Sequence, residues 1–312
     1  MIPLGIRIYG LGAIATGLVG LAWGDFALQW EPVAASFPGR TALAYIFSAL
    51  LVVAGTAVNW RRSSAALGAA ALVGLYAVVV VLMHGAEIIQ QPVAFVAWDG
   101  AAEQLALLAG GLASYACLAR ASGVVGPDAM GGPGAVREPG ADVSPSGRAE
   151  VAAAAGGRGA SPHDTRVSRV ALICMGVCLL MFGLAHFLYL GFTASMVPAW
   201  LPGGQKFWAV LTGAAHLAAG VALLSGIKAR LAANLLTVMF ASFSVLVHLP
   251  LLIANPHSHL NWVMSAINLA LTGAAWAIAT ALAQTNTRRE ELAADVLHAN
   301  FAGARIREGQ ES

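Results

Sequence analysis

Apolar residues are gathered along the chain into eight long runs that are separated by shorter polar segments. The runs lie at residues 7–25, 40–61, 65–84, 98–120, 167–191, 207–226, 230–250 and 260–283. Each is close to the ~20 mostly apolar residues that a helix needs to cross a bilayer, because the backbone polar groups must be satisfied inside the segment. The pattern therefore predicts an all-α membrane protein with eight transmembrane helices.

Two further segments lack such runs. Residues 121–166 are dominated by Gly, Pro, Ala and Ser, and such a composition buries too little apolar area to offset the entropy of ordering. Residues 284–312 are charged, and the capping-box pattern from Thr287 to Glu290 predicts a helical part within them. The predicted organisation is a four-helix membrane unit at 1–120, a disordered cytoplasmic linker at 121–166, a second four-helix unit at 167–283, and a charged, partly helical cytoplasmic tail at 284–312.

The composition supports a membrane protein and excludes two other classes. Hydrophobic residues make up 58% of the chain and charged residues 10%, whereas a soluble domain has about 25% charged residues. The formal net charge of +2 is too small to indicate a nucleic-acid partner, so the expected contact surface is the lipid bilayer. All three cysteines lie in apolar stretches, which does not suggest a disulfide framework.

The positive charges predict an orientation. Lys and Arg accumulate in cytoplasmic loops of membrane proteins. If the N-terminus is cytoplasmic, most of the basic residues near span ends fall on that side, and only Arg40 and Lys206 fall outside. The predicted topology is a multi-pass protein of the plasma (inner) membrane with both termini in the cytoplasm.

The two halves of the chain are similar to each other at a nearly constant offset. His84, Pro92 and Trp98 match His248, Pro256 and Trp262 at one spacing, and Gln104 falls opposite Asn268. Chance similarity between apolar segments does not place a His, a Pro and a Trp at the same offset in both halves. Because each unit has an even number of spans, both copies enter the membrane in the same sense. The predicted fold is therefore two parallel four-helix repeats.

The second half also resembles a known family. It reads AHF at 185–187, VPAWLP at 197–202, FWAVLTGAAHLAAG at 207–220 and HLPLLIANP at 248–256, and these segments resemble the DoxX-like family of bacterial integral membrane proteins. The first half is a looser match, with Trp23 near the place of His186 and Trp30-Glu31-Pro32 in the place of VPAWLP. The resemblance implies a tandem duplication of a four-helix unit. Because the family includes quinone-reducing thiosulfate dehydrogenase subunits, it also implies a quinone-linked redox subunit with a redox or membrane-complex partner.

Three ionisable residues within the apolar runs are the candidate binding residues. Ionisable groups at membrane depth are costly and mark functional sites. His186 and His216 lie in the fifth and sixth runs and Glu103 in the fourth. Counting residues places His186 near the outer end of its span and His216 halfway along the next, so the two are not expected to be level. On the quinone hypothesis, His186 contacts the head group, Glu103 exchanges its proton, and His216 lines the path below.

Other interpretations of these residues stay open at this point. His186 and His216 can equally serve as structural hydrogen-bonding residues between helices. A metal site is not expected, because no short ligand spacing is present. Five polar residues at the ends of the apolar runs or between them are expected to be solvated: Asp25, Glu31, Glu87, His257 and His259. The residues themselves do not determine whether the protein is an enzyme, and the alternative is a non-enzymatic transport, lipid-handling or assembly protein.

Overall fold

The computed structural model describes residues 1–27, 31–122 and 162–308, and within these ranges it is helical without any strand. Eight helical stretches are long and apolar enough to cross a membrane. The predicted all-α membrane fold is thereby confirmed. Most of the predicted linker at 121–166 falls on residues 123–161, which lie outside the described part of the chain. The prediction is wrong for its two ends, because residues 121–122 continue the helix that ends at Ser122 and residues 162–166 begin the helix that starts at Pro162.

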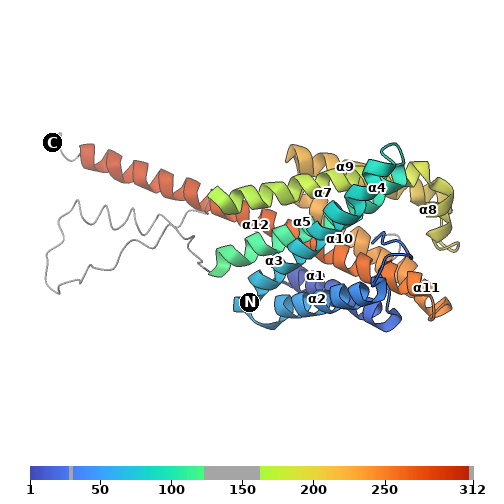
Figure 1. Cartoon of the computed structure of the whole chain (residues 1–312). Coiled ribbons are helices and arrows are strands. Elements are labelled where there is room, and N and C mark those ends of the chain that lie inside the picture. The colour runs from blue at the N-terminus through green and yellow to red at the C-terminus, as the bar shows by residue number, and fades with distance from the viewer. Residues whose placement is uncertain (28–30, 123–161, 309–312) are drawn as a thin grey trace, which may run out of the picture.

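Apart from the short helix α8 of the second half, the two halves contain matching elements in the same order (Figure 1). The first half comprises α1 (Leu4–Trp23), α2 (Arg40–Trp60), α3 (Arg62–Val78), the π-helix η2 (Val79–His84), α4 (Gly85–Gln90) and α5 (Phe95–Ser122). The second comprises α7 (Pro162–Leu188), α8 (Leu190–Met196), α9 (Gln205–Ser225), α10 (Ala229–Phe243), the π-helix η4 (Ser244–His248), α11 (Leu249–Ala254) and α12 (His259–Glu308). In each half, the α-helix, π-helix and short α-helix of the third span form one continuous stretch.

The two halves also share details of helix geometry and hydrogen bonding at matching positions. Both third spans contain a π-helix, and each π-helix ends at the matching histidine, His84 or His248. The Trp98 indole donates to the Pro92 carbonyl at 3.0 Å, and the Trp262 indole donates to the Pro256 carbonyl at 2.8 Å. These shared features show that the constant spacing seen in the sequence reflects two copies of one helical unit.

The two halves exchange helices where they pack together. The first helix of each half, α1 or α7, packs against the last helix of the other half, α12 or α5, and barely touches the last helix of its own half. The two last helices, α5 and α12, also pack against each other and are the most buried spans. Each half is therefore completed by a helix from the other, and neither four-helix unit closes by itself.

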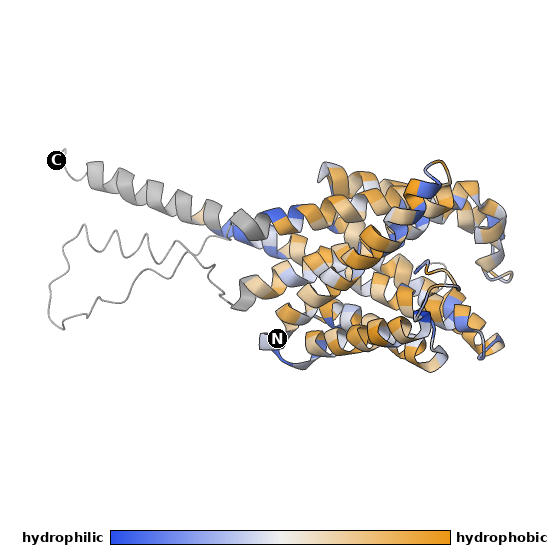
Figure 2. Cartoon of the chain, in the orientation of Figure 1, coloured by the Kyte–Doolittle hydropathy of each residue, from blue (hydrophilic) through white to orange (hydrophobic). Residues whose placement is uncertain are grey.

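Small residues allow this close packing. A Cβ on Gly12 would lie 2.4 Å from the Ala270 Cα, and a Cβ on Gly273 would lie 2.1 Å from the Tyr9 nitrogen. Both positions lie where α1 crosses α12, and only glycine lets the two backbones approach this closely. Many exposed residues are apolar, as expected for a lipid-facing surface. Figure 2 shows that hydrophobic residues predominate along the helices of the bundle.

The connections divide the bundle into two ends. Four connections lie at one end, which we call the loop end: residues 24–39, 91–94, 197–204 and 255–258. The N-terminus and the extension of α12 lie at the opposite end (Figure 1). The α12 helix runs without a break into the tail, and Thr287 Oγ1 donates to the Ala283 carbonyl inside it. The capping-box pattern at Thr287 therefore does not begin a new helix.

Candidate functional site

The structure brings His186 and His216 together in the second half. Their ring centroids are 5.1 Å apart, a distance typical of direct contact between aromatic rings. The expectation that the two histidines are not level is therefore wrong. Counting residues places His186 near the outer end of its span, but α7 and α9 approach each other closely at this residue, since a Cβ on Gly213 would lie 2.7 Å from the His186 Cβ. Gly213 lies about one helical turn before His216 on α9, so the two imidazoles lie at a similar depth.

Hydrogen bonds define the roles of the ring nitrogens. His216 Nδ1 is 2.9 Å from the Thr212 carbonyl, and His186 Nδ1 is 2.8 Å from the Phe182 carbonyl. A carbonyl oxygen can only accept, so each Nδ1 carries the hydrogen. In the neutral imidazole, each Nε2 then has the free lone pair. Two fixed rings present two Nε2 atoms to the same part of the bundle.

Aromatic side chains surround His216. Its ring centroid lies 6.0 Å from that of Phe182, 5.7 Å from that of Phe240 and 6.4 Å from that of Phe243. His216 is 2% exposed, whereas His186 is half-buried. The site therefore combines hydrogen-bonding ring nitrogens with an apolar aromatic wall, which is the usual composition of a small-molecule site.

Glu103 lies deeper in the bundle than His186. The α5 helix packs against α7, and the contact begins where Phe95 meets Tyr189, with ring centroids 5.9 Å apart. Glu103 is eight residues farther along α5, about 12 Å at 1.5 Å per residue, whereas His186 is only three residues from Tyr189. Both rings use their own helices for their Nδ1 bonds. Contact between Glu103 and this pair stays a prediction.

Asp99 is closer than Glu103 to the level of the histidine pair. It lies four residues after Phe95, about 6 Å along α5, and it is half-buried. The spacing from Phe95 to Asp99 is one helical turn, which keeps both residues on a similar face of α5.

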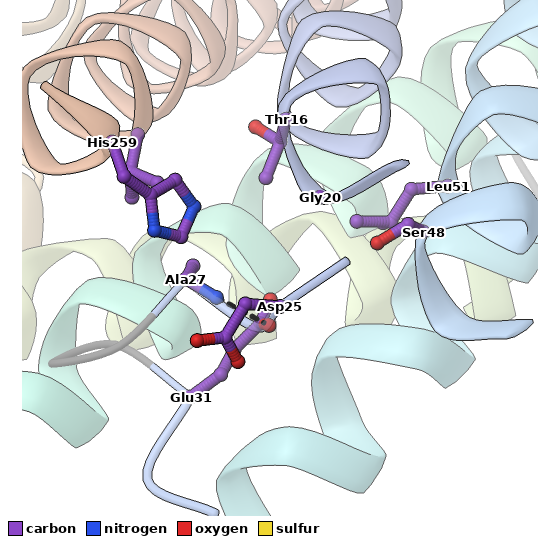
Figure 3. Close-up of a pocket in the computed structure, with 9 residues that line it drawn as sticks. Thr16, Gly20, Asp25, Ala27, Glu31, Ser48, Leu51 and His259 are labelled. Atoms are coloured by element: carbon purple, nitrogen blue, oxygen red, sulfur yellow. Dashed lines mark hydrogen bonds between the residues drawn. The ribbon is translucent and has the colours of Figure 1, made fainter. Parts of the chain in front are cut away.

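A second polar region lies at the loop end of the first half (Figure 3). It is a small recess with room for about one water molecule. The polar side chains that line it come from α1, α2, the α1–α2 connection and α12: Thr16, Asp25, Glu31, Ser48 and His259. Because α12 belongs to the second half, the exchange of helices between the halves creates this recess.

Glu31 is buried in this recess. It is 4% exposed, and its Oε2 accepts the Ala27 N–H at 3.0 Å. The expectation that Glu31 is solvated is therefore wrong, because described residues before it in the connection pack against the helices, as the burial of Phe26 and Ala27 shows. Its neighbour Asp25 forms an ion pair with Arg40 and also accepts the Phe26 N–H at 2.7 Å. Among the described residues, Glu31 has no cationic partner of its own.

The electrostatic environment of Glu31 favours its protonated form. The pKa of Glu31 is raised from 4.5 to about 7. Burial is the largest cause, the hydrogen bond from Ala27 acts in the opposite direction, and the negative charge of Asp25 contributes to the increase. A carboxyl group with such a pKa can take up or release a proton at neutral pH. One signal in the sequence pointed here, since the acidic Asp25 and the basic Arg40 flank an otherwise largely apolar connection.

His259 faces the two carboxylates from α12. Its ring stacks on Trp23 with centroids 5.2 Å apart and an interplanar angle of 16°. Figure 3 shows the imidazole pointing toward Asp25 and Glu31. Its Nε2 is buried without a hydrogen-bond partner among the described residues, and the residue as a whole is half-buried. The expectation of a solvated loop residue is thus wrong for His259 as well, because it begins α12 and packs on α1.

Comparison with known proteins shows a similarity over part of the chain and no activity. A family model described as a domain of unknown function (DUF8561) matches residues 175–283, which is most of the second half. No curated protein matches the chain, and no solved structure matches it. Over those residues, the chain is similar to a family whose function is not known.

Proposed function

We propose that the protein is a quinone-binding membrane subunit of the DoxX-like type, in which His186 and His216 bind the quinone head group. The observation that carries the proposal is the contact between the two rings, with both Nε2 atoms left over by the Nδ1 bonds. The resemblance at residues 185–187 and 207–220 supplies the ligand class, and the polar atoms and aromatic wall fit it. A quinone supplies reversible two-electron, two-proton chemistry when it is bound.

The two imidazoles suit both protonation states of such a ligand. A protonated ring donates from Nε2 to a carbonyl oxygen, whereas a neutral ring accepts at Nε2 from a hydroxyl group. The Nδ1 bonds to Phe182 and Thr212 hold the two rings in place in either state. Because the rings touch each other, the head group meets their Nε2 edges and does not lie between them.

The level arrangement changes the proposed division of roles. Both histidines can contact one head group, so His216 is a direct binding residue and not only part of a path. The side chains of Phe240 and Phe243 provide the apolar wall beside it. In this proposal Glu103 exchanges protons with the site from deeper in the bundle, and electrons pass to or from a redox partner subunit.

The proposal is tested by quinone binding to the purified full-length protein. A short-chain quinone is titrated into the wild type and into His186→Gln and His216→Gln, with the exposed His257→Gln as a matched control. Loss of one hydrogen bond to a charged or neutral ring corresponds to about 1–2 kcal/mol, so Kd is expected to rise about tenfold. The control should bind like the wild type.

Two outcomes contradict the proposal. If both variants keep wild-type affinity while remaining folded, the histidine pair is structural. If organic extracts of the purified protein contain lipid and no quinone, and added quinone does not bind, the non-enzymatic transport, lipid-handling or assembly alternative is favoured.

A further inference from the structure

The recess around Glu31 is separate from the histidine pair and has its own chemistry. It lies in the first half, is completed by α12, and does not share any lining residue with the pair. Its lining contains two carboxylates, two hydroxyl groups and one imidazole around a space for about one water molecule. Within the described residues, no three His, Cys, Asp or Glu side chains converge to hold a metal ion. A proton is the ligand that this set of groups can bind.

The charges around Glu31 explain why it can hold that proton. Arg40 is engaged by Asp25, and its Nε also donates to the Val33 carbonyl at 3.1 Å. The remaining titratable groups near Glu31 are His259 on α12 and Tyr76 on α3, which lies within electrostatic range of Glu31. Tyr76 is 1% exposed, and its hydroxyl has no hydrogen-bond partner among the described residues. A buried carboxylate without a cation is unfavourable in such surroundings, whereas a carboxylic acid is neutral.

His259 supplies a second proton-binding group that lines the same recess. Its Nε2 is buried and has no hydrogen-bond partner in the described structure, yet the residue is half-buried as a whole. The stack on Trp23 fixes the ring at the start of α12, at the loop end of the bundle. The imidazole therefore lies between the buried carboxyl and the exposed end of the molecule.

We propose that Glu31 and His259 form a proton-exchange site between the two halves, with one water molecule in the recess connecting them. In the forward step, the Glu31 carboxylic acid gives its proton to the water, and the water gives one of its protons to His259 Nε2. A carboxylate and an imidazolium replace a carboxylic acid and a neutral imidazole, so net charge is unchanged. The imidazolium then releases a proton to the solvent. The proposal does not depend on quinone binding at His186 and His216.

The first test measures the protonation of Glu31 by infrared difference spectroscopy of the full-length protein in lipid nanodiscs. The carbonyl stretching band of a protonated carboxyl should disappear as the pH rises through about 7. Glu31→Gln should abolish that band, and Glu290→Gln, which changes an exposed carboxylate, should leave it. If the band is present unchanged in Glu31→Gln, or absent from the wild type at pH 5, Glu31 is not the proton-binding group.

The second test measures the path through His259. On transfer to D2O at pH 6, the protonated carboxyl band shifts as its hydrogen is exchanged for deuterium. His259→Phe keeps a ring to stack on Trp23 but removes both nitrogens, and the exchange rate should fall by about tenfold or more. His257→Phe is the matched control, because this exposed histidine lies two residues earlier and outside the recess.

The outcomes of the second test are distinguishable. An exchange rate in His259→Phe equal to that of the wild type overturns the path through this residue. If His259→Phe does not fold, His259→Gln replaces it, since an amide keeps the polarity of the ring but does not titrate at this pH. A slow exchange in either folded variant, with wild-type exchange in the His257 control, supports the site.

Discussion

Replacing Glu31 by Gln should make the protein more stable at neutral pH and should remove part of its pH dependence. The folded protein holds the Glu31 proton more tightly than the unfolded chain, because the pKa of Glu31 is about 7 when folded and 4.5 ordinarily. Below pH 4.5 the Glu31 carboxyl is protonated in both the folded and the unfolded state, so it does not lower the free energy of unfolding. Between pH 4.5 and 7 the unfolded chain releases this proton first, so stability falls as the pH rises. Above pH 7 Glu31 is ionised in both states, and the free energy of unfolding is lowered by the full amount.

The magnitude follows from the size of the pKa difference. At 1.36 kcal/mol per pKa unit, the cost of an ionised Glu31 is about 3 kcal/mol at pH 8. Gln is neutral at every pH, and its side-chain oxygen can still accept the Ala27 N–H. Glu31→Gln should therefore match the wild type near pH 4.5 and exceed its free energy of unfolding by up to about 3 kcal/mol at pH 8.

The assay is thermal unfolding in detergent at pH 5, 6, 7 and 8, followed by tryptophan fluorescence. Other groups also titrate over this range, so the informative quantity is the difference between the variant and the wild type at each pH. Glu290→Gln is the control, because Glu290 is exposed and its replacement should shift all four values equally. Parallel curves for Glu31→Gln and the wild type would show that Glu31 is not held protonated in the folded protein.

Two further predictions concern the assembly of the helices. Gly273→Ala should lower the melting temperature, because the new Cβ would lie 2.1 Å from the Tyr9 nitrogen and overpacking of this kind costs about 1–3 kcal/mol of stability. Gly74→Ala is the control, because nothing lies within 4 Å of the new Cβ there. That variant should be neutral or stabilising by about 0.5–1 kcal/mol. Equal losses in the two variants would contradict close packing between α1 and α12 as the cause. Reporters fused after Arg62 should report the cytoplasm and those fused at Gly203 the opposite side, following the distribution of basic residues. The reverse result would overturn the predicted orientation.

The sequence by itself determined the eight spans and the repeat. A membrane span is recognised from a local property, the length of an apolar run, and this property does not depend on the neighbouring helices. The repeat was recognised because His84, Pro92 and Trp98 recur at one spacing. The structure adds a π-helix and a matching indole hydrogen bond to each copy. Neither feature changes the order of the elements.

Part of the candidate site was also visible in the sequence. His186 and His216 were chosen because histidines are rare and costly in apolar helices. Their relative depth does not follow from counting residues, since it depends on where the two helices cross. The close approach of Gly213 on α9 to His186 on α7 sets that crossing. A shift of a few residues in a helix crossing is enough to decide whether two side chains touch.

Only the tertiary structure decided which residues meet between the halves. The packing of α1 on α12 and of α7 on α5 is not encoded in any local pattern, because every span is similarly apolar. This exchange carries His259 of the second half to Asp25 and Glu31 of the first. It also buries Glu31, which residue type and position in a connection had suggested to be solvated. Burial and long-range contact are properties of the assembled bundle, and they turn a carboxylate in a connection into a group that holds a proton at neutral pH.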